Sequence, residues 1–444
     1  MYPLGHSPRV SSGSIRLVKG LINIIYMQKT AFVTLFVTMF LIMLGFGIII
    51  PHLNYFVMKM GATPSQLGLL IALYPAMQFL FSPLFGRWSD KIGRRPIMLV
   101  GLVGNTIALL SFGLSRSLLH LFLARAFWGT TTASLMPTVT AYVADITDDE
   151  HRGQGMGLIG ASVGLGFIAG PAFGAIFGDL HHWSFITAGI VSGLNTLFVL
   201  LFLSEPTDRN KASADQSNLS PLTMFTHPLA PLFLVTFISS FAFAGIETIF
   251  PLFIKHRWGY GTREIAIIFV VAGLISVLIQ GGAIGRLINR FGEFSLVLVG
   301  LLSTVIGLTI LPQATGFLTV TVYFCLASIG NIIIRPTNTA WVSKRAETEQ
   351  GTVIGLMNSH LSLGRVFGPI TSGMLYAGLE KSSVASGFLN RFLQMPDPIQ
   401  TDSAHLNLLQ LTISVFDLPY IPLAAGLLIT TLLLVRPLLK IWES

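Results

Sequence analysis

The chain has 444 residues, of which 52% are hydrophobic and only 10% are charged, and its formal net charge is +8. Soluble globular proteins carry about 25% charged residues, so this composition excludes a large soluble enzyme and indicates a polytopic membrane protein. The positive charge does not indicate nucleic-acid binding, because the basic residues follow the expected membrane topology. The single cysteine, Cys325, excludes a disulfide framework and a cysteine metal site, and we expect neither metal nor cofactor.

Apolar stretches of roughly 20 residues recur along the chain, and each is long enough to cross a bilayer as a helix. Helices are the expected spanning element, because these runs lack strand alternation and every backbone group must be bonded internally. The sequence therefore predicts an all-α protein with twelve transmembrane helices. They cover residues 30–55, 65–85, 97–115, 118–143, 155–178, 183–203, 229–254, 263–285, 294–313, 316–342, 352–377 and 417–437.

The two halves of the chain repeat each other at an offset of 198 to 200 residues. Because six spans is an even number, the repeat is parallel, and the fold is predicted to contain two six-helix bundles. The matched positions are Gly45 and Pro51 with Gly245 and Pro251, Gly86 and Gly93 with Gly285 and Gly292, Pro137 with Pro336, and Gly166, Gly170 and Pro171 with Gly364, Gly368 and Pro369.

An even number of spans places both termini on one side of the membrane. Most of the 27 basic residues fall on that side, so both termini are predicted to be cytoplasmic. The expected organisation is a cytoplasmic N-terminal segment, an N-terminal bundle, a cytoplasmic linker, a C-terminal bundle and a cytoplasmic tail. These parts correspond to residues 1–29, 30–203, 204–228, 229–437 and 438–444.

Two peripheral segments have less definite patterns. Residues 18–25 have one apolar face opposite basic residues, which fits either an amphipathic helix on the inner membrane surface or an extension of the first span. The stretch 378–416 is long for an outer loop, and a short interfacial helix is expected near residues 388–393. His181 and His182 fall in another outer loop, where we expect a solvated pair.

A ten-residue basic segment, GRWSDKIGRR at Gly86–Arg95, separates the second and third predicted spans. A tight charged hairpin is the simplest interpretation. The pattern resembles G-x-x-x-D-(K/R)-x-G-(K/R)-(K/R), the signature loop of the major facilitator superfamily, and it departs only at Trp88, where Leu is usual. The resemblance implies a cytoplasmic gate that also includes the acid at the end of the fourth span. Its residues are Gly86, Asp90, Gly93, Arg94, Arg95 and Asp145.

The second-half copy of this segment has different charges. Asn289 and Glu293 stand where the first half has Asp90 and Arg94. We therefore expect the second half-gate to be degenerate and assign gating to the first half.

The fifth predicted span carries glycine at every fourth position, Gly166, Gly170, Gly174 and Gly178, which gives a bare helix face that permits close packing. The segment GFIAGPAFGA, which includes Pro171, resembles the antiporter motif G-x-x-x-G-P-x-x-G-G of the same superfamily. In that family the motif marks exporters more than importers. The alternative is tight packing that any transporter would need.

Glu247 lies about 25 Å into the seventh span at a rise of 1.5 Å per residue. An intramembrane acid is costly and is a functional candidate by default. Its counterpart in the first half is Gly47, so the carboxylate is not part of the shared scaffold. We predict that it carries a coupling proton, and the alternative is a permanent pair with an embedded arginine. Its surroundings resemble those of an acid in some bacterial multidrug efflux proteins.

Three arginines are also embedded in predicted spans. Arg125 begins a stretch that resembles the second family motif, R-x-x-x-G-x-x-x-A, which implies a role in proton coupling; structural pairing is the alternative. Arg335 and Arg365 make the core net positive, which weakens any claim that the substrate is a cation. The expected substrate cavity contains Tyr74, Gln78, Trp128, Phe243, Arg335 and Arg365.

No enzyme site is evident, and no G-x-x-x-x-G-K-(S/T) loop is present, so ATP is not the expected energy source. The resemblances together identify the chain as similar to the twelve-span drug:proton antiporters of the major facilitator superfamily. They imply a monomeric inner-membrane exporter of hydrophobic or amphiphilic small molecules. Exporters of this kind contribute to antibiotic resistance. The alternatives are an exporter or flippase of one endogenous lipid or sugar conjugate and a non-transporting receptor.

Overall fold

The computed structural model describes residues 12–147, 152–206, 227–345, 350–381 and 420–443. This part of the chain is helical and has no strand. The first half contains α1 Ser12–Lys59, α2 Pro64–Ile92, α3 Arg94–Gly113, α4 Leu118–Thr132, α5 Leu135–Ile146, α6 Arg152–Gly174, η1 Ala175–Phe177 and α7 His181–Phe202. The second half contains α9 Ala230–Trp258, α10 Thr262–Leu278, η2 Ile279–Ala283, α11 Ile284–Ile310, η3 Leu311–Gln313, α12 Phe317–Arg345, α13 Gln350–Lys381 and α15 Tyr420–Glu443.

Every predicted span falls on a helix. Eight helices of the described chain have the length and hydropathy needed to cross a membrane, and α4 with α5, α10, α13 and α15 account for the remaining predicted spans. α1 begins at Ser12, ahead of the first predicted span, which favours the extended-helix alternative for residues 18–25. The proposed interfacial helix near residues 388–393 lies outside the described residues.

The fourth predicted span is broken where α4 ends and α5 begins. Pro137 has no N–H to donate to the carbonyl of Ala133, and this oxygen instead accepts a hydrogen bond from Ser82 Oγ at 3.1 Å. Hydroxyl side chains on both sides bond back to the preceding turn, as Thr132 Oγ1 does to Trp128 O at 2.7 Å. The kink therefore follows from a missing backbone donor and local side-chain competition.

The basic segment between α2 and α3 is not the ten-residue hairpin that the sequence predicts. α2 continues to Ile92 and α3 begins at Arg94, so Gly93 alone breaks the helix, with φ of 132°. The second-half copy is broken in the same way, because Gly292 interrupts α11 with φ of 75°. Glycine tolerates these positive φ values because it lacks a Cβ. We call the end of the helices that carries Gly93 and Gly292 the gate end.

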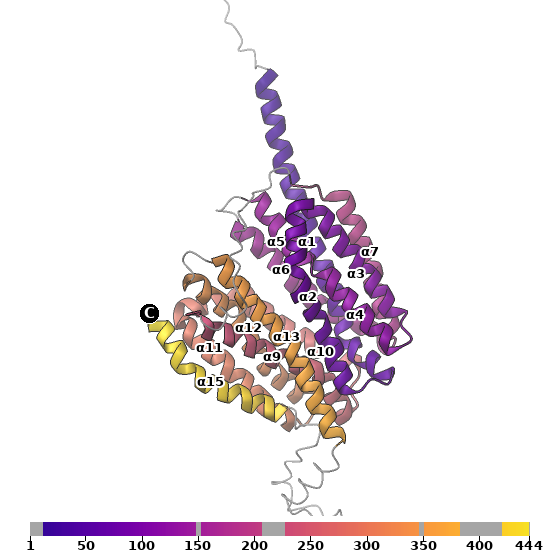
Figure 1. Cartoon of the computed structure of the whole chain (residues 1–444), viewed down its shortest axis with the longest axis vertical. Helices are drawn as coiled ribbons and strands as arrows, with labels where there is room; N and C mark the ends of the chain where they lie inside the picture. The colour runs from indigo at the N-terminus through magenta and orange to yellow at the C-terminus, as the bar shows by residue number, and fades with distance from the viewer. Residues whose placement is uncertain (1–11, 148–151, 207–226, 346–349, 382–419, 444) are drawn as a thin grey trace, which may run out of the picture.

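The helices form two groups that meet along a central interface (Figure 1). In the first group, α1 packs against α6 and α7, and in the second, α9 packs against α13. The two groups meet through α2 against α13 and through α6 against α10. The pairs α1 with α6 and α9 with α13 occupy corresponding places in the two halves, as the parallel repeat predicts.

The glycine face of α6 lies directly against α1. A Cβ at Gly166 would lie 2.7 Å from Met43 Cβ, and one at Gly174 would lie 2.7 Å from Ile48 O. A Cβ at Gly170 would meet Gly47. Close packing on this face is thus confirmed for these three glycines, because any larger side chain would separate the helices. Gly178 lies beyond the helix, with φ of 50° and open space around it.

The hydrogen bonds between the halves that the described residues make lie at the end opposite the gate end. Asn54 Nδ2 donates to Thr248 O at 2.9 Å, and Tyr55 Oη donates to Tyr260 O at 2.9 Å. The ammonium of Lys255 lies 4.7 Å from the centre of the Tyr55 ring. The first of these contacts lies directly beside Glu247 and the others lie beyond it, so the acid lies next to the end of the interface that is away from the gate.

Candidate functional site

Glu247 occupies the middle of α9 and is half-buried. The next residue, Thr248, supplies the carbonyl that accepts the hydrogen bond from Asn54 of the other half. The corresponding position in the first half is Gly47, whose added Cβ would lie 2.8 Å from Gly170 Cα. The first half therefore uses this position for close helix packing, whereas the second half places a carboxylate there.

Two arginines interact electrostatically with Glu247. Arg365 on α13 is the stronger partner, and Arg125 on α4 of the other half is the weaker. Within the described chain, neither arginine comes within the 4 Å that defines an ion pair with this carboxylate. The acid thus faces a cation from each half without a direct contact to either, and its charge affects both halves at once.

Arg125 is held by aromatic rings. Its guanidinium carbon lies 4.7 Å from the centre of the Tyr74 ring and 4.8 Å from that of Trp128. The side chain is buried, and its Nε and Nη1 have no hydrogen-bond partner among the described residues. Ring faces attract a cation through their quadrupole, but they leave the N–H donors unsatisfied. Arg125 is therefore a buried cation that retains a capacity to bind an anion or water.

Hydrogen bonds fix the position of the Trp128 side chain. It is 2% exposed, and its indole N–H donates to Asn105 Oδ1 at 2.6 Å. Asn105 in turn donates to Ser192 Oγ at 2.8 Å. Trp128 thus fixes the ring that Arg125 rests on. Sequence reasoning missed Asn105, although an asparagine inside an apolar run was a visible signal.

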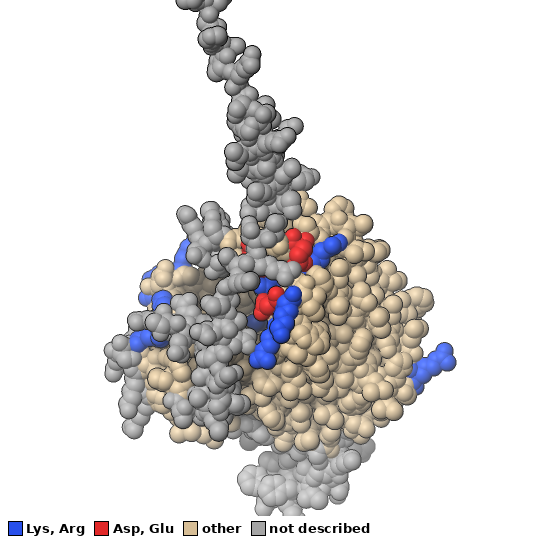
Figure 2. Space-filling view, turned by 45° about the horizontal axis from the view of Figure 1, so that its top comes forward, with Lys and Arg blue, Asp and Glu red and all other residues tan. Residues whose placement is uncertain are grey.

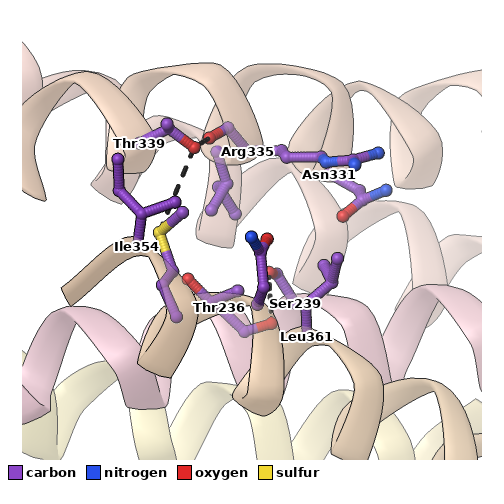
Figure 3. Close-up of a pocket in the computed structure, with 10 residues that line it drawn as sticks. Thr236, Ser239, Asn331, Arg335, Thr339, Ile354 and Leu361 are labelled. Carbon is purple, nitrogen blue, oxygen red and sulfur yellow. Dashed lines mark hydrogen bonds between the residues drawn. The ribbon is translucent and has the colours of Figure 1, made fainter. Parts of the chain in front are cut away.

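A second cluster lies in the other half. Arg335 on α12 and Arg365 on α13 are both exposed and interact electrostatically with each other. Arg335 lines a cavity of about 230 Å³ between α9, α12 and α13 (Figure 3). The cavity has polar and apolar walls. Its other lining residues include Thr236, Ser239, Asn331, Met357, Asn358 and Leu361.

The structure brings the expected cavity residues together in two groups. Tyr74 accepts a hydrogen bond from Gln78 Nε2 at 3.1 Å, and the rings of Tyr74 and Trp128 lie against Arg125. Arg335 and Arg365 form the other group. Phe243 is half-buried on α9, one turn before Glu247.

The first-half gate residues form a network at the gate end. Arg94 Nε donates to Asp145 Oδ2 at 2.7 Å, and its Nη1 also pairs with Asp90. The backbone N–H groups of Arg94 and Arg95 donate to the carboxylate of Glu205 at 2.7 and 2.9 Å. Figure 2 shows acidic and basic side chains meeting near the centre of this face. Sequence reasoning missed Glu205, which follows α7 and caps the start of α3.

The second half-gate is not degenerate, contrary to the sequence prediction. Glu293 follows Gly292 as Arg94 follows Gly93, and it forms an ion pair with Lys344. Lys344 occupies the position in α12 that corresponds to Asp145 in α5. The two halves therefore carry equivalent pairs with opposite charges, which residue-by-residue comparison of the motif could not reveal.

The known proteins that this chain resembles are transporters. The Major Facilitator Superfamily profile matches residues 35–369. The chain belongs to the major facilitator superfamily. It is 32% identical to multidrug resistance protein 2 of Bacillus subtilis over 79% of the chain and 89% of that protein. It is 29% identical to the quinolone resistance protein NorA of Staphylococcus aureus, over 79% of the chain and 90% of that protein.

Solved structures share the fold of this superfamily member. A bacterial homologue of the human lysosomal transporter Spinster, in an inward-facing and unoccupied conformation, superposes with a TM-score of 0.73 at 17% identity. The match covers 94% of the chain and 98% of that structure. Family and fold together make this protein a multi-pass membrane transporter and not an enzyme, as the signature segment predicted.

The histidines of this transporter lie differently from the prediction. His181 is 2% exposed rather than solvated, and its Nδ1 lies 3.0 Å from Nδ1 of His52 on α1. His52 Nε2 lies 2.8 Å from Gly174 O, and His182 Nδ1 lies 3.0 Å from Gly113 O. His181 and His182 therefore join α7 to α1 and α3 at the end away from the gate, and His52 joins α1 to α6 there.

Proposed function

We propose that this transporter exports hydrophobic or amphiphilic small molecules, including drugs, in exchange for protons. The drug-efflux names of its relatives support the substrate class. The observation that carries the coupling is Glu247, an embedded carboxylate that faces Arg365 of its own half and Arg125 of the other. A group that interacts across the interface of the two halves is well placed to link its protonation to their relative position.

The mechanism follows from charge. An ionised Glu247 attracts Arg125 across the interface and favours approach of the two halves at this level. A protonated Glu247 loses that attraction and favours a different relative position. If substrate binds the first state better, proton and substrate compete through conformation, which is what antiport requires.

The gate networks complete the proposal. Arg94, Asp90 and Asp145 hold α2, α3 and α5 together at the gate end, where an ion-pair network that re-forms between states can control opening. We place this end at the cytoplasm, with both termini cytoplasmic in the inner membrane and the protein acting as a monomer. The two moving bodies are residues 30–203 and 229–437.

The test uses purified protein in liposomes loaded with a fluorescent hydrophobic drug. An imposed pH gradient should drive uphill transport without ATP, and Glu247→Gln should abolish it while leaving exchange of substrate for substrate. Glu264→Gln is the matched control, because this acid caps the start of α10 and does not belong to the group formed by Glu247, Arg365 and Arg125. Transport that ignores a protonophore and requires ATP would refute the proposal.

A further inference from the structure

We propose that the cavity beside Arg335 binds an acidic group of the cargo, so that the preferred substrates are amphiphiles that carry a carboxylate, sulfonate or phosphate group. This inference rests on the proposed function as an exporter of amphiphiles and names the substrate class within it.

The first argument is charge balance. One acid, Glu247, interacts electrostatically with Arg365 and Arg125. A third arginine, Arg335, interacts electrostatically with Arg365. The region therefore stays positive even when Glu247 is ionised. Arg335 interacts electrostatically with another arginine, Arg365, and makes no ion pair among the described residues. Like charges that face one another repel, and a bound anion would offset that repulsion.

The second argument is the set of free hydrogen-bond donors. Within the described chain, the guanidinium of Arg335 makes no hydrogen bond, and Asn331 lies beside it in the cavity wall (Figure 3). Thr236 is already engaged, because its Oγ1 accepts from Asn338 Nδ2 at 2.7 Å and donates to Leu232 O. Unused donors next to a cation match an anionic acceptor, for which charge-assisted hydrogen bonds are strong.

The third argument is size and apolar lining. Apolar side chains of α13, Ile354, Met357 and Leu361, also line the cavity. A volume of about 230 Å³ is below the ~300–1,000 Å³ of pockets that enclose a whole drug-sized ligand. The cavity therefore takes the acidic end of the molecule and its first apolar atoms, while the rest extends into the space between the halves.

Arg365 links this cavity to the coupling acid, because it interacts with both Arg335 and Glu247. Removing the charge of Glu247 makes the surroundings of the cavity more positive. At a fixed conformation, neutral Glu247 therefore strengthens anion binding, so competition between proton and cargo arises through the change of state and not through charge at the cavity.

The test is equilibrium binding to purified protein in nanodiscs of uncharged lipid, with empty nanodiscs subtracted. Two fluorescent probes share one apolar body: 8-anilino-1-naphthalenesulfonate, which is anionic, and N-phenyl-1-naphthylamine, which lacks the sulfonate. Arg335→Gln should weaken binding of the sulfonate about tenfold and leave the neutral probe unchanged. Arg286→Gln, which removes an exposed charge of α11, should change neither probe.

One further variant separates loss of the charge from misfolding. Arg335→Lys keeps the charge and should retain most of the sulfonate affinity, which excludes misfolding as the cause of the loss. Unchanged sulfonate binding in Arg335→Gln, or an equal loss for both probes, would overturn the proposal. Because the assay has no gradient, failure of proton coupling would appear in flux and leave these results intact.

Discussion

The two half-gates have the same geometry and opposite charges. In the first half a glycine with positive φ is followed by Arg94, which pairs with Asp145. In the second half a glycine with positive φ is followed by Glu293, which pairs with Lys344. Coulomb attraction does not depend on which partner carries which sign. The repeat therefore preserves the break in the helix and the ion pair, while the individual charges are interchangeable.

The surroundings of the two pairs differ more than the pairs themselves. The side chains of Arg94 and Asp145 are 8% and 3% exposed, whereas that of Lys344 is 63% exposed. Arg94 also begins a helix, where a positive charge is unfavourable beside the helix dipole, and the carboxylate of Glu205 offsets this unfavourable interaction. Glu293 is an acid at a helix start, where a negative charge is favourable, so it needs no such partner. The first half-gate is thus a buried network, and the second is a partly solvated pair.

The largest expected effect is loss of the buried acid of the first pair. Asp145→Asn leaves Arg94 buried with an incomplete set of partners, and an uncompensated buried charge costs about 3–5 kcal/mol. Lys344→Gln removes an exposed partner and should cost about 1 kcal/mol or less. The free energy of unfolding, measured by denaturation of both variants in the same detergent, checks this. Equal losses would show that burial does not distinguish the two gates.

An exchange of charges within each pair should have an intermediate effect. Glu293→Lys combined with Lys344→Glu should restore nearly wild-type stability, because within the described chain the pair has no other charged partner. Arg94→Asp combined with Asp145→Arg should recover only part of the loss, since the new acid would lie beside Asp90 and Glu205. Thermal unfolding of the single and double variants measures both couplings. Full rescue in the first half would contradict a role for its network.

The smallest effect on stability is expected at Asp90. Its side chain is 51% exposed, and the second half has Asn289 at the corresponding position, so Asp90→Asn should change the free energy of unfolding by less than about 1 kcal/mol. Transport should nevertheless slow, because the gate loses one of its alternative partners for Arg94. Flux and substrate binding are measured on the same preparation. A loss of binding with normal interconversion of states would place Asp90 in the substrate site instead.

Hydropathy predicted the helices well but misplaced their ends at the gate. The charged residues between Arg87 and Ile92 predict a loop by hydropathy, whereas α2 continues through them. A helix does not stop where it leaves the apolar layer, because its hydrogen bonds are internal. The break comes at Gly93, where the backbone conformation changes, and hydropathy carries no information about that.

The sequence by itself determined the all-helical fold, the parallel repeat and the positions of the charged segments, because long apolar runs and recurring glycines and prolines are local features. Only the tertiary structure decided which groups meet: Lys344 with Glu293, His181 with His52, and Arg94 with Asp145. Such pairs join different helices, and each residue turns the side-chain direction by about 100°. Partners therefore depend on how packed helices are rotated against one another, which no single segment of the sequence specifies.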